Sequence, residues 1–533
     1  MTRVQNLFGR TPTSSADTKN FHGMPAWTLP LPERFIQVTL TNTLGNTFYL
    51  KQSDMLEQTK EVHAEMLKAD PAFYAKGLVF ARNKGYMRSQ PAYGLACLAR
   101  DSRPEARLAF AQAFGEVIRT PNDLNDFMTI HASLANGSIG GRRVKRVIGA
   151  WMTEKLSEYW TIKYGTERKA GSYTLRDTMQ LVHPKTGEPR PLFDYIMGES
   201  EKRKVDISTL PQIQQFEALK KAKTDEEKIA AIKIGRLPHE VVTPFIGSSK
   251  KLWEALVPNL PIFALLKNLA TLERQGVIES CKEEVLRKLT SPQIIQRSKI
   301  LPFRFIEAEK HVTATWVKDA LRDAVELAFD NVPEIPGKTA VLLDVSPSMQ
   351  PGMGWFHHTP SPADAARALI GPASVLSVAV AKKAKCDVVA FDGSAKRISI
   401  SQRDSLLTQA QKFWGVHVHP RGGTNQSAAL DILRVDNEKV DNVVLLTDGE
   451  QNMGRPFAQA LQEYRVALSR KAKVFVIDVS PHGHALMAPD DKNVYCVSGW
   501  SDQILNFIAL ASQGWTSLAD HVKSLDLETA PKP

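Results

Sequence analysis

The sequence contains the stretch Thr339-Ala-Val-Leu-Leu-Asp344-Val-Ser346-Pro-Ser348-Met, in which a mostly apolar run leads into a carboxylate and two hydroxyls. A short buried run that ends in polar residues indicates a central strand of an open α/β sheet. Ligands of such sheets bind beyond the carboxyl ends of the strands, where Asp344, Ser346 and Ser348 are expected to lie. Because their oxygens are hard ligands, the stretch predicts a site for Mg²⁺ or a similar divalent cation.

Two later segments complete this pattern. Thr424 follows the two glycines of a turn that begins at Arg421, and Asp448 follows the apolar run 442–447. The order Asp-x-Ser-x-Ser, then Thr, then Asp resembles the metal-ion-dependent adhesion site of von Willebrand factor A (vWA) domains. The metal ligands that this resemblance implies are Asp344, Ser346, Ser348, Thr424 and Asp448.

The surrounding sequence alternates between apolar runs and helical segments, which predicts a mostly parallel, doubly wound, Rossmann-like sheet. We expect this vWA domain to span residues 336–514 and to be followed by a C-terminal tail at 515–533. The expected strands are 339–344, 386–391, 442–447, 473–479 and 493–497.

The preceding part of the chain is helical. Between residues 53 and 330, segments of helical character follow one another at short intervals, and many begin near a proline, which suits the first turn of a helix. This predicts an α-solenoid of HEAT-like helical repeats over residues 31–335. Residues 1–30 are polar and interrupted by prolines, so we expect a mobile segment, and the alternating, threonine-rich residues 33–50 predict an extended pair.

Composition narrows the cellular setting. A chain of 533 residues is expected to form two or three domains, and its four scattered cysteines favour a reducing compartment over a disulfide framework. The sequence lacks both a signal-peptide core and a run of 18 apolar residues, so we expect a cytoplasmic protein with no membrane partner.

The positive charge is concentrated in the helical part. The chain has a formal net charge of +11; from Pro336 onward it has 20 Lys or Arg and 19 Asp or Glu, and the preceding part has 48 and 38. A basic excess in one domain is expected of a polyanion binder, although solvated helix faces would give the same count.

The basic stretches, together with the C-terminal vWA pattern, resemble the Ro (TROVE domain) family and are close to its bacterial members. They are the turn 81–91, which contains Arg88, the stretch 140–146, and the segments 160–169 and 173–185. The resemblance extends from about residue 25 to about residue 515. The RNA-binding candidates that it implies are Lys163, Arg168, Lys169, Arg176 and His183, and the basic stretches add Arg88, Arg142 and Arg143.

The resemblance implies a monomeric ring of HEAT-like repeats closed by the vWA domain. Family members bind small noncoding Y RNAs on an outer basic face and the single-stranded 3′ ends of misfolded or structured RNA in the hole of the ring. Bacterial relatives work with an exoribonuclease, polynucleotide phosphorylase. The expected role is therefore noncoding-RNA stabilisation and RNA quality control by a protein that is not an enzyme.

The alternative hypothesis is a vWA-type protein-binding adaptor, in which the metal site docks an acidic residue of a partner. An enzyme is the least favoured class, because no pair of acids is accompanied by a base in the sequence around the predicted metal site.

Overall fold

The chain folds into two compact units. The sheet unit comprises residues 1–66 and 332–525, and the helical unit comprises residues 67–331 and 526–533. The computed structural model describes residues 16–20, 22–28, 30–41, 52–85, 87–134, 141–165, 173–185, 190–201, 205–350, 368–414, 422–469, 471–480, 486–487, 491, 493–498, 504–512 and 518–527.

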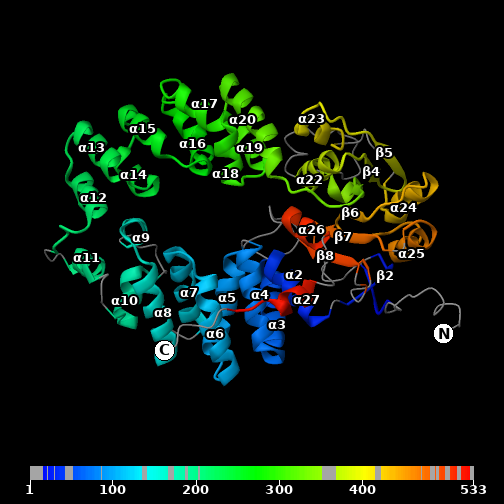
Figure 1. Ribbon diagram of the computed structural model, residues 1–533, viewed down its shortest axis with the longest axis horizontal. Helices are drawn as coiled ribbons and strands as arrows, with labels where there is room; N and C mark the ends of the chain where they lie inside the picture. The colour runs from blue at the N-terminus through cyan, green and yellow to red at the C-terminus, as the bar shows by residue number, and fades with distance from the viewer. Residues whose placement is uncertain are drawn as a thin grey trace. The chain divides into compact units, whose positions relative to one another are not determined.

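The sheet unit is built on a six-stranded sheet in the order β5-β4-β3-β6-β7-β8 (Figure 1). Its strands are β3 (Thr339–Asp344), β4 (Val388–Phe391), β5 (Ala395–Ile398), β6 (Asn442–Thr447), β7 (Lys473–Asp478) and β8 (Val494–Ser498). All neighbouring pairs are parallel except β4 and β5, which are antiparallel. The predicted doubly wound sheet is confirmed, and β5 is the strand that the sequence pattern did not indicate.

Both faces of the central strand β3 are buried, which explains its continuous apolar sequence. On one face, Leu342 shares a core with Leu430 of α24 and Leu461 of α25. On the other side of the sheet, α22 packs against β3 and β4. The helices that follow the strands are α22 (Ile370–Ala384), α23 (Leu406–Gln411), α24 (Gln426–Val435), α25 (Phe457–Ala467), α26 (Ile504–Ser512) and α27 (Leu518–Ser524).

The N-terminal residues are part of the sheet unit. Strands β1 (Thr18–Lys19) and β2 (Pro25–Ala26) pair with each other, and helices α2 (Leu31–Thr41) and α3 (Gln52–Ala69) follow. Helix α2 packs against β8 and α27 (Figure 1). The extended pair that the sequence predicted over residues 33–50 is wrong for residues 33–41, because burial of one face of α2 outweighs the strand propensity of its threonines and valine.

The described part of the predicted mobile segment also has packing partners. Trp27 is 8% exposed and packs against Ala458 and Cys496, and the Asn20 amide donates a hydrogen bond of 2.9 Å to the carbonyl oxygen of Gln451. These contacts lie between residues distant in the sequence, so the polar composition of residues 16–28 did not reveal them.

The helical unit consists of consecutive short helices, which follow one another from blue through green in Figure 1. They are α4 (Pro71–Asn83), α5 (Ser89–Arg100), α6 (Pro104–Val117), α7 (Pro121–Leu134), α8 (Arg142–Lys155), α9 (Glu158–Tyr164), α10 (Leu175–Val182), α11 (Arg190–Glu201), α12 (Pro211–Lys221), α13 (Asp225–Gly235), α14 (His239–Ile246), α15 (Lys250–Leu256), α16 (Ile262–Arg274), α17 (Lys282–Thr290), α18 (Pro292–Ser298), α19 (Pro302–Glu309) and α20 (Thr315–Ala328).

The first helices of this unit pack in the alternating manner of a solenoid. Helix α4 packs against α6, and α5 packs against α7, so that among these four every second helix lies in the same layer. Their shared core includes a cluster of fully buried rings, Phe110, Phe114 and Phe127. The predicted helical array is confirmed, whereas closure of a ring stays a prediction. Among the described residues, no helix is long and apolar enough to cross a membrane.

Candidate metal site and nucleic-acid interface

The predicted metal site begins at the carboxyl end of β3. Asp344 is fully buried; its Oδ1 accepts a hydrogen bond of 2.9 Å from the Ser346 amide, and its Oδ2 accepts one of 2.7 Å from the Thr447 hydroxyl. The hydroxyl oxygens of Ser346 and Ser348 lie 3.1 Å apart. The carboxylate and both hydroxyls of the Asp-x-Ser-x-Ser motif are therefore held at one end of the central strand.

Thr424 is brought to the same end of the sheet by its turn. Gly422 and Gly423 adopt positive φ angles of 65° and 81°, which glycine reaches without a Cβ clash. The Thr424 amide donates to the Asn452 side-chain oxygen at 2.7 Å, and the Asn452 amide donates to the Thr424 carbonyl oxygen at 3.1 Å. This reciprocal pair ties the turn to the loop that follows Asp448.

Electrostatics at this site favour a cation. Asp448 follows β6 and is 4% exposed. Burial, and after it the negative charge of Asp448, raise the pKa of Asp344 to about 7. Two carboxylates buried close together are costly unless a positive charge lies between them. The available donors are carboxylate and hydroxyl oxygens, which suit Mg²⁺, so the residues present fit a hard divalent cation.

Thr447 also holds Asp344 in place, and it is not among the ligands predicted from the sequence. Besides donating to Asp344, its hydroxyl accepts hydrogen bonds from the Gln426 amide group at 2.8 Å and from the Gly449 backbone at 3.1 Å. Thr447 immediately precedes Asp448, and this polar residue at the end of an apolar strand is the sequence signal that could have identified it.

Among the predicted RNA-binding residues, Lys163 lies in the most structured environment. It is in α9, and its Nζ is 2.6 Å from a carboxylate oxygen of Glu240, which is in α14. The Lys163 ammonium also lies 5.7 Å and 5.6 Å from the ring centroids of Tyr159 and Tyr164. Lys163 is therefore framed by aromatic rings and one anion.

Arg176 and His183 lie on and just after α10. A capping box between Thr174 and Asp177 starts this helix, and His183 ends it in a left-handed conformation with φ of 51°. His183 is exposed and Arg176 is half-buried. The residues after His183 lie against α8, because the Thr153 hydroxyl donates to the Lys185 carbonyl oxygen at 3.0 Å.

Arg142 and Arg143 open helix α8, and both are exposed. Because α8 also packs against α10, the structure places these arginines on the same pair of helices as Arg176 and His183. We call six basic residues that lie on these two helices or just after α10 the α8–α10 basic surface; they are Arg142, Arg143, Arg146, Arg176, His183 and Lys185. Arg168 and Lys169 lie outside the described residues, as does Arg421.

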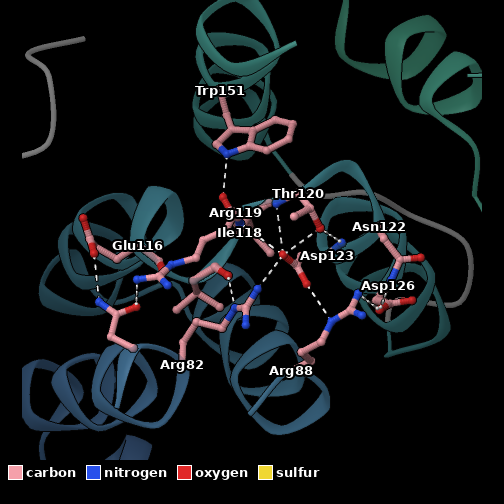
Figure 2. A network of polar contacts seen from close by, with 12 residues as sticks. Arg82, Arg88, Glu116, Ile118, Arg119, Thr120, Asn122, Asp123, Asp126 and Trp151 are labelled. Atoms are coloured by element: carbon pink, nitrogen blue, oxygen red, sulfur yellow. Dashed lines mark hydrogen bonds and ion pairs between the residues drawn. The ribbon is translucent and has the colours of Figure 1, made fainter. Parts of the chain in front are cut away.

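Arg88 has a structural role in addition to its predicted one. Figure 2 shows Arg88 and Arg82 converging on the buried carboxylate of Asp123. Arg88 Nε donates to Asp123 at 3.0 Å, and its Nη2 lies 3.5 Å from Asp126. The side chain of Arg88 is nevertheless 48% exposed, so part of its guanidinium remains accessible to solvent.

Comparison with known protein families finds two matching domains. The TROVE domain model matches residues 239–326, and the Ro60 vWA domain model matches residues 338–510. The chain thus contains a TROVE domain match and a Ro60 vWA domain match, as expected from its resemblance to the Ro (TROVE domain) family. The two matched segments lie in the helical unit and the sheet unit, respectively, so each unit carries one of the characteristic Ro family domains.

Ro relatives match over most of the chain. The RNA-binding protein RO60 of Deinococcus radiodurans is 26% identical, over 96% of this chain and 99% of the relative. The protein of the same name from Caenorhabditis elegans is 24% identical over 73% of this chain and 70% of the relative. The crystal structure of the Deinococcus radiodurans RO (RSR) protein covers 91% of this chain and all of that chain, with a TM-score of 0.69 and 21% identity. This likeness shows the fold.

Proposed function

We propose that this chain is an RNA-binding protein that binds small noncoding Y RNAs and the single-stranded 3′ ends of misfolded or structured RNAs. The observation that carries the proposal is the gathering of predicted RNA-binding residues on adjacent helices of the helical unit, in the α8–α10 basic surface and around Lys163. The names of its Ro relatives, RNA-binding protein RO60, support it.

The chemistry of these helices suits RNA. Exposed arginines neutralise phosphates and release counterions, which supplies much of the affinity for RNA. Near Lys163, Tyr159 is 37% exposed and can stack on an unpaired base, a contact worth about 1–3 kcal/mol when stacking is complete. Cations therefore account for affinity, and aromatic rings account for a preference for unpaired nucleotides.

The proposed role is noncoding-RNA stabilisation and RNA quality control in the cytoplasm, by a monomeric ring that acts as a binder rather than an enzyme. Decay of the bound RNA would be carried out by an exoribonuclease partner such as polynucleotide phosphorylase. In the sheet unit, Asp344, Ser346, Ser348, Thr424 and Asp448 would hold Mg²⁺. The cation would supply an open coordination position for a carboxylate of a partner protein.

A filter-binding assay tests RNA binding. The probe is a structured RNA with a single-stranded 3′ tail, titrated with the full chain at several salt concentrations. Replacing Lys163 and Arg176 by alanine is expected to weaken binding roughly tenfold or more and to flatten the salt dependence, because two phosphate contacts are lost.

The matched control replaces two cations of the same helical unit by alanine: Lys310, the C-cap residue of α19, and Arg322 of α20. This control removes the same charge and is expected to retain most of the affinity. Equal losses in the two double variants, or binding of the unaltered chain that does not weaken with salt, would contradict the proposal.

The second candidate function is that of a protein-binding adaptor, and the grouping of the Asp344 carboxylate with the Ser346 and Ser348 hydroxyls favours it. It predicts that an acidic partner is retained by the chain in Mg²⁺, released by EDTA, and not retained by Asp344→Ala. Because the metal site is in the sheet unit and the RNA candidates are in the helical unit, both functions can belong to one protein.

A further inference from the structure

The environment of Lys163 contains an anion at a surface proposed to bind another anion. Glu240 Oε1 lies 2.6 Å from the Lys163 ammonium, and Glu240 Oε2 lies 3.0 Å from His239 Nδ1. The Lys163 side chain is only 16% exposed, whereas that of Glu240 is 41% exposed. Glu240 is therefore the more exposed partner of the pair, and it is already paired with the ammonium that an incoming phosphate would contact.

Both groups are ionised near neutral pH. Burial opposes the charge of Lys163, but its hydrogen bond to Glu240 and the charge of that carboxylate raise the pKa of Lys163 overall. Burial is also the largest influence on Glu240 and opposes its charge, but the Lys163 hydrogen bond, a backbone hydrogen bond and the charges of His239 and Lys163 together lower the pKa of Glu240. The pair is thus a charge-assisted contact that a competing anion has to break.

The groups around the pair suit a nucleotide better than a protein carboxylate. The rings of Trp160 and Tyr164 are stacked, with centroids 5.9 Å apart, beside Tyr159. On α16, the Lys267 ammonium lies 4.5 Å from the ring centroid of Phe263, which is 41% exposed. Lys267 is close enough to His239 that it helps to lower the pKa of that histidine, after burial and together with Lys163.

We propose that Glu240 is a competing anion that controls RNA binding at Lys163. In the RNA-free protein its carboxylate forms an ion pair with the Lys163 ammonium. When an RNA strand binds, a phosphate of the strand takes the place of that carboxylate. This inference rests on the proposed function and adds its regulation. Displacing Glu240 has a cost, so a ligand with a single phosphate gains little, whereas an RNA strand offsets the cost through its other contacts.

Removing the negative charge of Glu240 is expected to strengthen RNA binding, although Glu240 belongs to the site. The variant Glu240→Gln keeps the size of the side chain and removes its charge. In filter binding with an unpaired RNA oligonucleotide, it is expected to tighten binding by the full chain about threefold to tenfold at low salt. The gain is expected to shrink as salt screens the charges.

The matched control is Glu307→Gln. Glu307 is also in the helical unit and is also paired with one lysine and one histidine, at 2.5 Å from Lys310 and 3.5 Å from His311. Since this control changes the net charge by the same amount, an equal gain in both variants overturns the proposal. Unchanged or weaker binding by Glu240→Gln in a chain that melts at the wild-type temperature overturns it as well.

A second pair of variants tests the route through Lys163. Glu240→Gln is expected to tighten binding in the wild-type background and to have no effect in a Lys163→Ala background, because the ammonium that it frees is absent. A gain that persists without Lys163 overturns the proposal. If Glu240→Gln lowers the melting temperature, Glu240→Ala replaces it in both backgrounds, with the same expected and contradicting results.

The outcomes also separate this inference from RNA binding itself. If the unaltered chain binds RNA and Glu240→Gln does not tighten it, RNA binding stands and the inference fails. If neither binds RNA, both fail.

Discussion

At the scale of single residues, Asp123 organises the first part of the helical unit. It lies in the first turn of α7. Its carboxylate accepts a hydrogen bond of 2.8 Å from Arg82 of α4 and one of 3.0 Å from Arg88 at the start of α5. The Thr120 amide and hydroxyl donate to it at 3.0 Å and 2.9 Å (Figure 2). A single buried anion therefore ties three helices together.

Removing this anion is expected to be costly. In Asp123→Ala, the Arg82 side chain, which is 11% exposed, loses its charged partner inside the protein. We expect the free energy of unfolding of the helical unit to fall by about 3–5 kcal/mol, measured by urea denaturation followed by circular dichroism.

The control for this prediction is Asp126→Ala. Asp126 is also in α7 and also contacts Arg88, but it is 50% exposed, so its loss is expected to cost less than about 1 kcal/mol. Similar costs for the two variants would show that Asp123 does not act as a buried partner.

Thr447 is placed to support the proposed metal site in a comparable way. Thr447→Val preserves the shape of the side chain and removes the hydroxyl that donates to Asp344. We expect the affinity for Mg²⁺, measured by isothermal titration calorimetry, to fall about tenfold, because a hydrogen bond that orients a metal ligand strengthens metal binding.

Thr339→Val is the matched control, since Thr339 is equally buried but begins β3, at the end of the sheet away from Asp344. Its Mg²⁺ affinity is expected to stay at the wild-type value. A loss that is the same in both variants would mean that the valine substitutions disturb the sheet rather than the metal site.

At the scale of elements, the N-terminal segment is held by packing that acts over a long sequence distance. Trp27 contacts residues of α25 and β8, and α2 lies against β8 and α27. Burial of these apolar surfaces offsets the entropy lost in ordering a polar, proline-containing segment. Helix α2 therefore depends on the sheet for its stability more than on its own propensity.

Trp27→Ala is expected to loosen the N-terminal segment and the edge of the sheet together. Loss of a buried indole costs about 3–5 kcal/mol, so amide hydrogen exchange should accelerate in α2 and in β8. Leu108→Ala, which truncates an apolar side chain that is 56% exposed, is expected to leave exchange unchanged. Fast exchange confined to residues 16–28 in Trp27→Ala would contradict the coupling.

At the scale of the whole molecule, the proposed RNA-binding residues and metal ligands are divided between the two units. The predicted cations belong to the helical unit, and Asp344 with its hydroxyl neighbours belongs to the sheet unit. This division agrees with the charge counts, because nearly all of the net positive charge lies before residue 336.

We therefore expect metal and RNA binding to be separable. Asp344→Ala should abolish Mg²⁺ binding. It should leave the affinity for an unpaired RNA oligonucleotide within about twofold of wild type, which is a change of about 0.4 kcal/mol in the free energy of binding. Lys163→Ala should do the reverse. Filter binding and calorimetry on the same preparations provide both measurements, and joint loss of the two activities in either variant would contradict separability.

Much of the fold, and the place of the candidate metal ligands at a strand end, could be predicted because the signals are local. The run 339–344 is apolar throughout since both faces of its strand are buried, and the polar residues that follow must lie at the sheet edge. Helix α2 was predicted as an extended segment, because its threonines and valine favour strands in the absence of β8 and α27. Strand β5 has an exposed edge and a mixed sequence, so periodicity did not reveal it.

The sequence by itself determined which residues form the central strand, which carry the hydroxyl and carboxylate oxygens, and where the basic residues are concentrated. These properties follow from composition and spacing along the chain. Only the tertiary structure decided that Glu240 pairs with Lys163, that Asp123 joins two arginines, and that Trp27 packs against α25 and β8. The physical reason is that an ion pair or a buried contact depends on distance in space, and these partners lie on separate elements whose sequence separation carries no information about that distance.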